Sequence, residues 1–220
     1  MKTIAIIDCA PDEPSLACYN RLLQLGIPCS YHSACDFGMS TLENLDNFYG
    51  GIIFGSISNV EDKEPWHKEL AEWAVNALEK DFPLLGICFG HQLMCHTLGG
   101  KVVINREVDP EQKGSREITF SKDFGTIMAG ETKEVVVSHS YRVTDLPDDF
   151  EELARSELFP NDVVRHKRLP FVGIQPHPEA SEYFIIEDFK ENPLPKENAE
   201  RTYVDGMEFI HSFLNTYCFK

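Results

Sequence analysis

Short apolar runs alternate with amphipathic stretches over the first hundred residues of the chain. The runs at 3–8 and 51–55 are short and continuously apolar, as in strands that are buried on both faces of a parallel sheet. Between such runs, apolar residues recur at helical spacing, and the first of these stretches stops at Gly26. Alternation of this kind predicts βαβ units. The predicted strands are 3–8, 28–32, 51–55 and 84–87, and the predicted helices are 14–25, 65–79 and 91–98.

Beyond Gly100 the pattern favours strands, with apolar and polar positions mixed as in half-solvated antiparallel pairs. We expect strands at 101–104, 116–120, 133–138, 162–167 and 171–175, and a final helix at 198–217. The whole chain, 1–220, then forms one α/β domain. It has a mostly parallel central sheet with helices on both faces and an added antiparallel portion. Residues 187–200 are expected to be an insertion that forms a solvated loop, with a partner surface as the alternative.

Composition narrows the choice of partners and compartment. The formal net charge of -16 argues against nucleic acid and anionic membranes as partners, because both favour clustered Lys and Arg. Seven cysteines without paired spacing, and an amino terminus without a signal-peptide layout, predict a cytoplasmic protein with reduced thiols. No apolar run is long enough to predict a transmembrane helix.

A Gly-x-Cys-x-Gly segment joins the predicted strand at 84–87 to the helix that follows it. Its glycines, Gly86 and Gly90, permit a sharp reversal that would expose the side chain of Cys88 at the end of a strand. The following helix would direct free N–H groups at the sulfur, which favours the thiolate. Cys88 is therefore a candidate nucleophile.

Two other interpretations of Cys88 remain open at this point. An apolar setting is typical of an inert core cysteine. A metal site is the second alternative, because Cys88, His91, Cys95 and His96 lie within nine residues, and His91 and Cys95 could share a helix face. Neither a Cys-x-x-Cys pair nor a second distant pair at zinc-like spacing accompanies them, so no metal or other cofactor is predicted.

A second motif supplies a candidate base. After the strand at 171–175, two prolines bracket His177, and Glu179 follows two residues later. The prolines hold the imidazole on a stiff turn, and the carboxylate can accept one ring N–H while the other nitrogen takes a proton from a thiol. An α/β-hydrolase would place its acid well before its histidine, which disfavours that class.

The two motifs together, Leu85-Gly86-Ile87-Cys88-Phe89-Gly90-His91-Gln92 and Gln175-Pro176-His177-Pro178-Glu179, closely resemble those of the class I glutamine amidotransferases. The resemblance covers nearly the whole chain, and the Phe-Gly-His-Gln form is similar to the glutaminase part of GMP synthase and related stand-alone proteins. It implies that Cys88, His177 and Glu179 form a catalytic triad. It also implies an oxyanion hole from the N–H of Phe89 and from Gly55 or Ser56.

The resemblance further implies that Gln92 contacts the substrate and that the backbone of Ser138, His139 and Ser140 holds its α-amino and carboxylate groups. Two segments depart from the family pattern. Consecutive glycines followed by proline are usual where this chain has Gly55-Ser56-Ile57. The residues after His139, Ser140-Tyr141-Arg142, also differ from those of GMP synthase.

Two enzymatic functions follow as expectations. The first is hydrolysis of the side-chain amide of glutamine through a Cys88 thioester, with ammonia released to a separate synthetase chain. The alternative is a stand-alone hydrolase or transferase of γ-glutamyl amides or small γ-glutamyl peptides. A non-enzymatic module is disfavoured because Cys88, His177 and Glu179 are all present.

Overall fold

The computed structural model describes residues 1–105 and 112–219. In chain order the main elements are β1 (Thr3–Asp8), α1 (Leu16–Gln24), β2 (Cys29–Ser33), α2 (Ala34–Phe37), β3 (Phe48–Ile53), α3 (Pro65–Leu78), β4 (Leu84–Ile87), α4 (Phe89–Thr97), β5 (Lys101–Ile104), β6 (Gln112–Phe120), β7 (Thr132–His139), β8 (Tyr141–Asp145), β9 (Phe150–Arg155), β10 (Val163–His166), β11 (Phe171–Ile174), α5 (Glu182–Asp188) and α6 (Lys196–Phe213).

Within the described residues, nine strands form one sheet in the order β2-β1-β3-β4-β11-β10-β9-β6-β7, and β5 and β8 form a separate antiparallel pair. The strands from β2 to β11 are parallel to one another. From β10 to β7 the pairing is antiparallel. The predicted α/β class is confirmed, and most of the antiparallel portion is continuous with the parallel strands.

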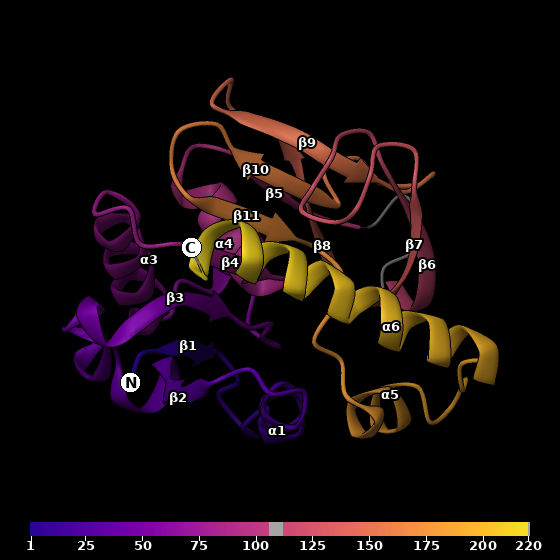
Figure 1. The fold of residues 1–220 in the computed structure, drawn as a ribbon, viewed down its shortest axis with the longest axis horizontal. Coiled ribbons are helices and arrows are strands. Elements are labelled where there is room, and N and C mark those ends of the chain that lie inside the picture. Colours follow the sequence, from indigo (N-terminus) through magenta and orange to yellow (C-terminus); the bar gives the residue numbers. More distant parts are fainter. Residues whose placement is uncertain (106–111, 220) are drawn as a thin grey trace.

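Helices cover both faces of the sheet because β1 is apolar on both sides. Ile4 and Ile6 pack with residues of α1 and α6, whereas Ala5 and Ile7 face α3 and α4. This alternation follows from the two-residue period of a strand. Figure 1 shows α6, in yellow, crossing in front of the sheet, with α5 beneath it. Two apolar layers therefore hold the strand ends in place.

The predicted elements differ from the structure mainly at their ends and in the acidic second half. The last helix begins earlier than expected, at Lys196, and a π-helical turn, Leu214–Cys218, replaces its end. Strands β8 and β9 were not predicted. β9 is hard to recognise in the sequence because it is rich in charged residues. Its Leu153 and Ala154 are fully buried, whereas Glu151 forms an ion pair with Arg165 and Glu152 forms one with Arg155.

The prediction that residues 187–200 form a solvated loop is wrong in part. The end of α5 and the first turn of α6 occupy both ends of this stretch. Between them Phe189 is buried and packs with Val136 and Ala180, and Leu194 lies against the same cluster. Burial of these apolar side chains orders a segment whose proline and acidic residues suggest a loop.

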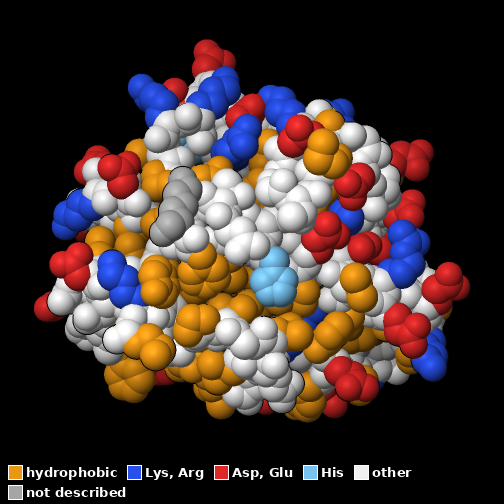
Figure 2. All heavy atoms as spheres, in the orientation of Figure 1, with side chains coloured by type: hydrophobic (Ala, Val, Ile, Leu, Met, Phe, Trp, Pro, Cys, Tyr) orange, Lys and Arg blue, Asp and Glu red, His pale blue; other side chains and the backbone are white. Residues whose placement is uncertain are grey.

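No helix among the described residues is both long enough and apolar enough to span a membrane. On the face seen in Figure 2, acidic and basic side chains are interspersed around the rim, and apolar side chains gather in the lower half.

Candidate active site

Cys88 occupies a strained position between β4 and α4. Its φ and ψ angles are 48° and -100°, a combination that L-residues rarely adopt. Its N–H donates to the Ile174 carbonyl at 2.9 Å, and its own carbonyl accepts from Gln92 N–H at 2.9 Å. The turn is thus fixed from β11 on one side and from α4 on the other, and the side chain is held at the carboxyl ends of the parallel strands.

The two glycines of this turn allow the helix to lie directly on the strand. A Cβ on Gly86 would lie 2.7 Å from the carbonyl carbon of Gly90, and a Cβ on Gly90 would lie 2.5 Å from the Ile53 carbonyl oxygen. No side chain fits at either position without displacing backbone. The close packing that sets the direction of Cys88 therefore depends on both residues.

His177 and Glu179 form a buried pair next to this cysteine. The Nδ1–H of His177 donates to Glu179 Oε1 at 2.9 Å, and their side chains are only 7% and 4% exposed. Because the carboxylate can only accept, the bond places a proton on Nδ1. Nε2 makes no hydrogen bond of normal geometry with the described residues. The structure thus brings together the three residues expected to form a triad.

The electrostatic environment favours a protonated His177. Burial opposes the charged form, but the carboxylate of Glu179 and the thiolate form of Cys88 outweigh it and raise the pKa of His177 well above its usual value. The buried carboxylate and the neighbouring sulfur therefore favour the charged form of the imidazole.

Several elements hold the loop that carries His177. The His177 N–H donates to the Val136 carbonyl of β7 at 2.8 Å. From α1, the buried guanidinium of Arg21 donates to the Pro178 carbonyl at 3.2 Å and to the Ala180 carbonyl. The ring of Phe184 on α5 packs on the imidazole at a centroid distance of 5.1 Å. The base is thereby positioned from both halves of the sheet.

The loop after β3 lies against the candidate triad. A Cβ on Gly55 would lie 2.8 Å from His177 Cε1 and 3.4 Å from Cys88 Cβ. Phe89 is the first residue of α4, where N–H groups lack intrahelical partners. The Ser56 hydroxyl accepts from the Ser58 N–H at 3.0 Å, which turns the loop back on itself. Phe89, Gly55 and Ser56 remain predicted oxyanion-hole residues, and the structure places Gly55 in contact distance of the site.

Gln92 lies on α4, one helical turn after Cys88, and is almost wholly buried. Its Nε2 donates to the Tyr141 carbonyl at 3.0 Å and to Gln175 Oε1 at 3.1 Å. Gln175 in turn directs its Nε2 at Cys88 Sγ, 3.7 Å away. The expected substrate contact of Gln92 could therefore come only from its Oε1, because both N–H groups are engaged.

The segment expected to hold the substrate passes on the other side of the cysteine. The carbonyl oxygen of Ser138 lies 3.9 Å from Cys88 Sγ, and the Ser140 carbonyl accepts from Asn105 N–H at 2.9 Å. His139 is buried against Phe159 and donates from Nδ1 to the Tyr141 carbonyl at 2.9 Å. Burial and the nearby Arg116 guanidinium lower its pKa to about 3, so this imidazole is neutral.

The metal site considered as an alternative for Cys88 is not seen among the described residues, where no three side chains of metal-binding type converge. His91 and Cys95 do share a helix face, with Nδ1 and Sγ 3.6 Å apart. Both are fully buried, and burial lowers the pKa of His91 to about 3 and raises that of Cys95. They belong to the packing between α4 and β11, where His91 lies against Gly173.

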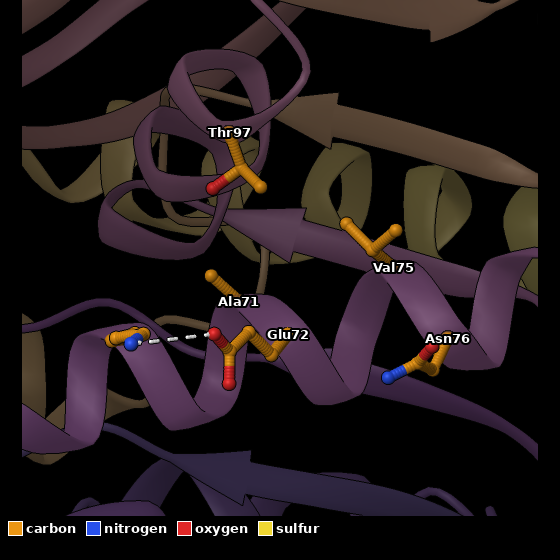
Figure 3. A pocket seen from close by; sticks show the side chains of 6 residues that line it. Ala71, Glu72, Val75, Asn76 and Thr97 are labelled. Carbon is orange, nitrogen blue, oxygen red and sulfur yellow. Dashed lines mark ion pairs between the residues drawn. The ribbon is translucent and has the colours of Figure 1, made fainter.

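A hollow of about 400 Å3 lies between α3 and α4, at the end of α4 away from Cys88. Figure 3 shows Ala71 and Val75 of α3 on the side toward Thr97 of α4. Asn76 also lines the hollow, and Lys68 and Glu72 form an ion pair at its edge. It contains none of the residues predicted to bind or convert a substrate.

Sequence reasoning did not identify Arg21 or the role of Gln175. Arg21 lies in a helix whose other features are ordinary, and its three carbonyl partners are 157 or more residues away in the chain. Gln175 offered a weak signal, because it lies two residues before His177, at the period that brings strand side chains to one face.

The fold is that of an α/β protein with a cysteine at a strand-to-helix turn and a buried His–Glu pair beside it, an arrangement that can support nucleophilic chemistry. The family model described as "Glutamine amidotransferase class-I" matches residues 15–183. The chain is therefore a member of the class I glutamine amidotransferases.

Several curated proteins are similar to this chain. It is 34% identical over 144 residues to a protein from Pyrococcus abyssi that is named as one of the subunits of a glutamine-hydrolyzing GMP synthase, covering 64% of this chain and 72% of that one. It is 33% identical over 146 residues to the glutamine-hydrolyzing GMP synthase of Desulfotalea psychrophila, covering 65% of this chain. The match spans only 27% of the length of the Desulfotalea protein.

Solved structures share the fold at low identity. A glutamine amidotransferase from Thermotoga maritima superposes with a TM-score of 0.77 and 18% identity over 100% of both chains. A chain of the structure titled PurLQS, also from Thermotoga maritima, gives a TM-score of 0.72 at 19% identity over 98% of this chain and 99% of that one.

Proposed function

We propose that the protein hydrolyses the side-chain amide of glutamine through a γ-glutamyl thioester on Cys88 and releases ammonia for a separate synthetase. The observation that carries the proposal is the buried His177–Glu179 pair, with a 2.9 Å hydrogen bond, beside a cysteine held at φ 48°. Family membership supports the chemistry. The name of the Pyrococcus abyssi relative, which describes one of several chains of a GMP synthase, supports delivery to a partner chain.

The first half of the reaction would use the thiolate and the imidazolium. Cys88 Sγ attacks the carboxamide carbon, and the carbonyl electrons move to oxygen, which is stabilised by Phe89 N–H and by an N–H of the Gly55–Ser56 loop. When the tetrahedral intermediate collapses, the C–N bond breaks and His177 Nε2 gives its proton to the departing ammonia. A γ-glutamyl thioester and a neutral imidazole remain.

The second half would consume one water. His177 Nε2 takes a proton from water as the oxygen attacks the thioester carbon, and Cys88 leaves as thiolate, so that glutamate is released and the imidazolium is restored. Glu179 orients the ring through Nδ1 and stabilises its positive charge in both halves. Each group returns to its starting state, and the net reaction is glutamine plus water to glutamate plus ammonia.

A second candidate function is hydrolysis of γ-glutamyl amides or small γ-glutamyl peptides. It is favoured by Arg142, whose guanidinium lies over the Phe159 ring at 5.4 Å and bonds Asn105 Oδ1 at 3.3 Å, two residues after Ser140. A cation at this place would suit a substrate with a carboxylate beyond the γ-amide.

The test combines covalent labelling with ammonia release. A chloroketone analogue of glutamine should label the peptide that contains Cys88, as detected by mass spectrometry, and Cys88→Ala should remove the label. The matched control is Cys35→Ala, which removes a partly buried cysteine away from the site and should leave labelling unchanged. Absence of Cys88 labelling in the wild-type protein would refute both candidate functions.

Assays of ammonia release then distinguish glutamine hydrolysis for a partner chain from hydrolysis of other γ-glutamyl compounds. Release from glutamine that is slow in isolation and rises on addition of a synthetase supports delivery to a partner chain. Faster turnover of γ-glutamyl dipeptides than of glutamine, lost in Arg142→Met, supports the second candidate.

A further inference from the structure

A chain of amide groups runs from the β8 backbone to the candidate nucleophile. It begins at the carbonyl of Tyr141, passes through the side chain of Gln92 and then that of Gln175, and ends at Cys88 Sγ. Gln92 and Gln175 are 3% and 2% exposed, so water does not compete freely for these groups. Neither the triad mechanism nor the predicted substrate contacts use Gln175.

The direction of each bond in this chain is determined by its first member. A backbone carbonyl can only accept, so the side-chain nitrogen of Gln92, not its oxygen, must face Tyr141 at 3.0 Å. The second N–H on that nitrogen points at Gln175 and requires an acceptor, which places Gln175 Oε1 toward Gln92 at 3.1 Å. The nitrogen of Gln175 is thereby turned toward the sulfur, 3.7 Å away.

We propose that Gln175 donates a hydrogen bond that stabilises the thiolate of Cys88, and that Gln92 is a positioning residue that fixes the orientation of Gln175. A hydrogen bond to an ionised acceptor is stronger than one to a neutral acceptor, so the donor favours thiolate over thiol. A reversed amide would present its oxygen to the sulfur and favour the thiol.

The surroundings of the sulfur make this donor important. The Ser138 carbonyl oxygen, 3.9 Å from Sγ on another side, can accept from the thiol but repels the thiolate. Gln175 offsets that repulsion. His177 would stabilise the thiolate through its positive charge, which depends on pH. Gln175 would stabilise it through a neutral N–H donor, which does not.

The proposal rests on Cys88 being the nucleophile of the proposed function, so the test is made without glutamine. The rate of Cys88 carboxamidomethylation by iodoacetamide is measured against pH by peptide-resolved mass spectrometry, which follows thiolate content. Loss of a donor to a charged group corresponds to roughly one pH unit in the midpoint of this profile. We therefore expect the midpoint to move upward by about one unit in Gln175→Leu, with about tenfold slower alkylation below it.

Two further variants isolate the donor from simple packing. Gln175→Glu keeps the size of the side chain and its acceptor toward Gln92 but removes the N–H, and should raise the midpoint at least as much as Gln175→Leu. Gln92→Leu releases the amide of Gln175 and should raise it less. In the Gln175→Leu background, Gln92→Leu should add no further shift, because it acts only through Gln175.

The matched control is Gln24→Leu on the exposed surface of α1, which should leave the midpoint unchanged. Midpoints that stay at the wild-type value in the Gln175 variants, with thermal melts showing folded protein, would overturn the proposal. If Gln175→Leu does not fold, Gln175→Glu decides the matter. If the Gln175 variants show the expected upward shift but the wild-type protein releases no ammonia, the proposed function is refuted and the role of Gln175 stands.

Discussion

Substitution of Gly55 by alanine tests whether the loop after β3 must approach the candidate triad this closely. The added Cβ would lie 2.8 Å from His177 Cε1 and 3.4 Å from Cys88 Cβ. Carbon atoms in contact lie at about 3.5–4.0 Å, so the imidazole would have to withdraw by roughly 0.7 Å or more. The neighbouring atoms on Cys88 leave less room for the loop itself to retreat.

Withdrawal of the imidazole would disturb both of the roles proposed for it, as proton donor to ammonia and as base toward water. The ring is tied to Glu179 Oε1 at 2.9 Å and covered by Phe184, so it cannot move without losing one of these contacts. A misplacement of about 1 Å can cost about 100-fold in rate. We expect Gly55→Ala to lower kcat for glutamine hydrolysis by roughly 10- to 100-fold. The free energy of unfolding should fall by only about 1–3 kcal/mol, as for other overpacked sites.

The control is Gly51→Ala in β3, whose Cβ would lie 2.9 Å from Leu84 Cδ2, far from the site along the same strand. It creates a similar clash in the core, so it should destabilise the protein comparably yet keep kcat. Steady-state ammonia release and urea unfolding measure the two quantities. Wild-type kcat in Gly55→Ala, or an equal loss in both variants, would refute the reasoning.

Three other predictions concern the supports of the site. The pKa of His177 is raised in the folded protein, so the protonated imidazole stabilises the fold fully below about pH 6.5, and this stabilisation is lost as the pH rises through the folded-state pKa. The difference in unfolding free energy between wild type and His177→Asn should therefore shrink with rising pH. A difference that stays constant would contradict this. Arg21→Met should destabilise by about 3 kcal/mol in urea unfolding, because three backbone carbonyls lose a buried donor, whereas the exposed Arg201→Met should cost less than about 1 kcal/mol. Gly173→Ala places a Cβ 2.4 Å from His91 Nδ1 and should lower Tm, and His91→Ala should partly restore it; no rescue would exclude this clash as the cause.

The parallel half of the fold could be predicted well because its signals are local. The strand at 84–87 and the start of α3 at Pro65 agree with the structure, since an apolar run and a proline at the first helical position are unambiguous. β9 and α5 could not be found in this way. Glu151 of β9 depends on an ion pair with Arg165 in β10, and the burial of Phe189 just after α5 depends on Val136 in β7, a strand much earlier in the chain.

The residues of the candidate site that lie in short contiguous motifs could be predicted from the sequence. Cys88, His177 and Glu179 come together as expected. The contacts of Gln92 were not predictable, because Gln92 and its partners Tyr141 and Gln175 come from three different parts of the chain. Motifs thus indicate the candidate reactive groups, and tertiary packing decides which way each amide group faces.

The position of β11 has a consequence for the order in which the protein acquires its chemistry. It is the last of the described strands in the chain, yet it lies in the middle of the sheet, between β4 and β10. During synthesis Cys88 emerges long before His177 and Gln175, which reach it only once β11 has been inserted. Such non-local pairing is slow and forms late in folding. A chain that has not yet inserted β11 therefore lacks the groups proposed to activate Cys88, and the proposed reactivity would arise only when the central sheet is complete.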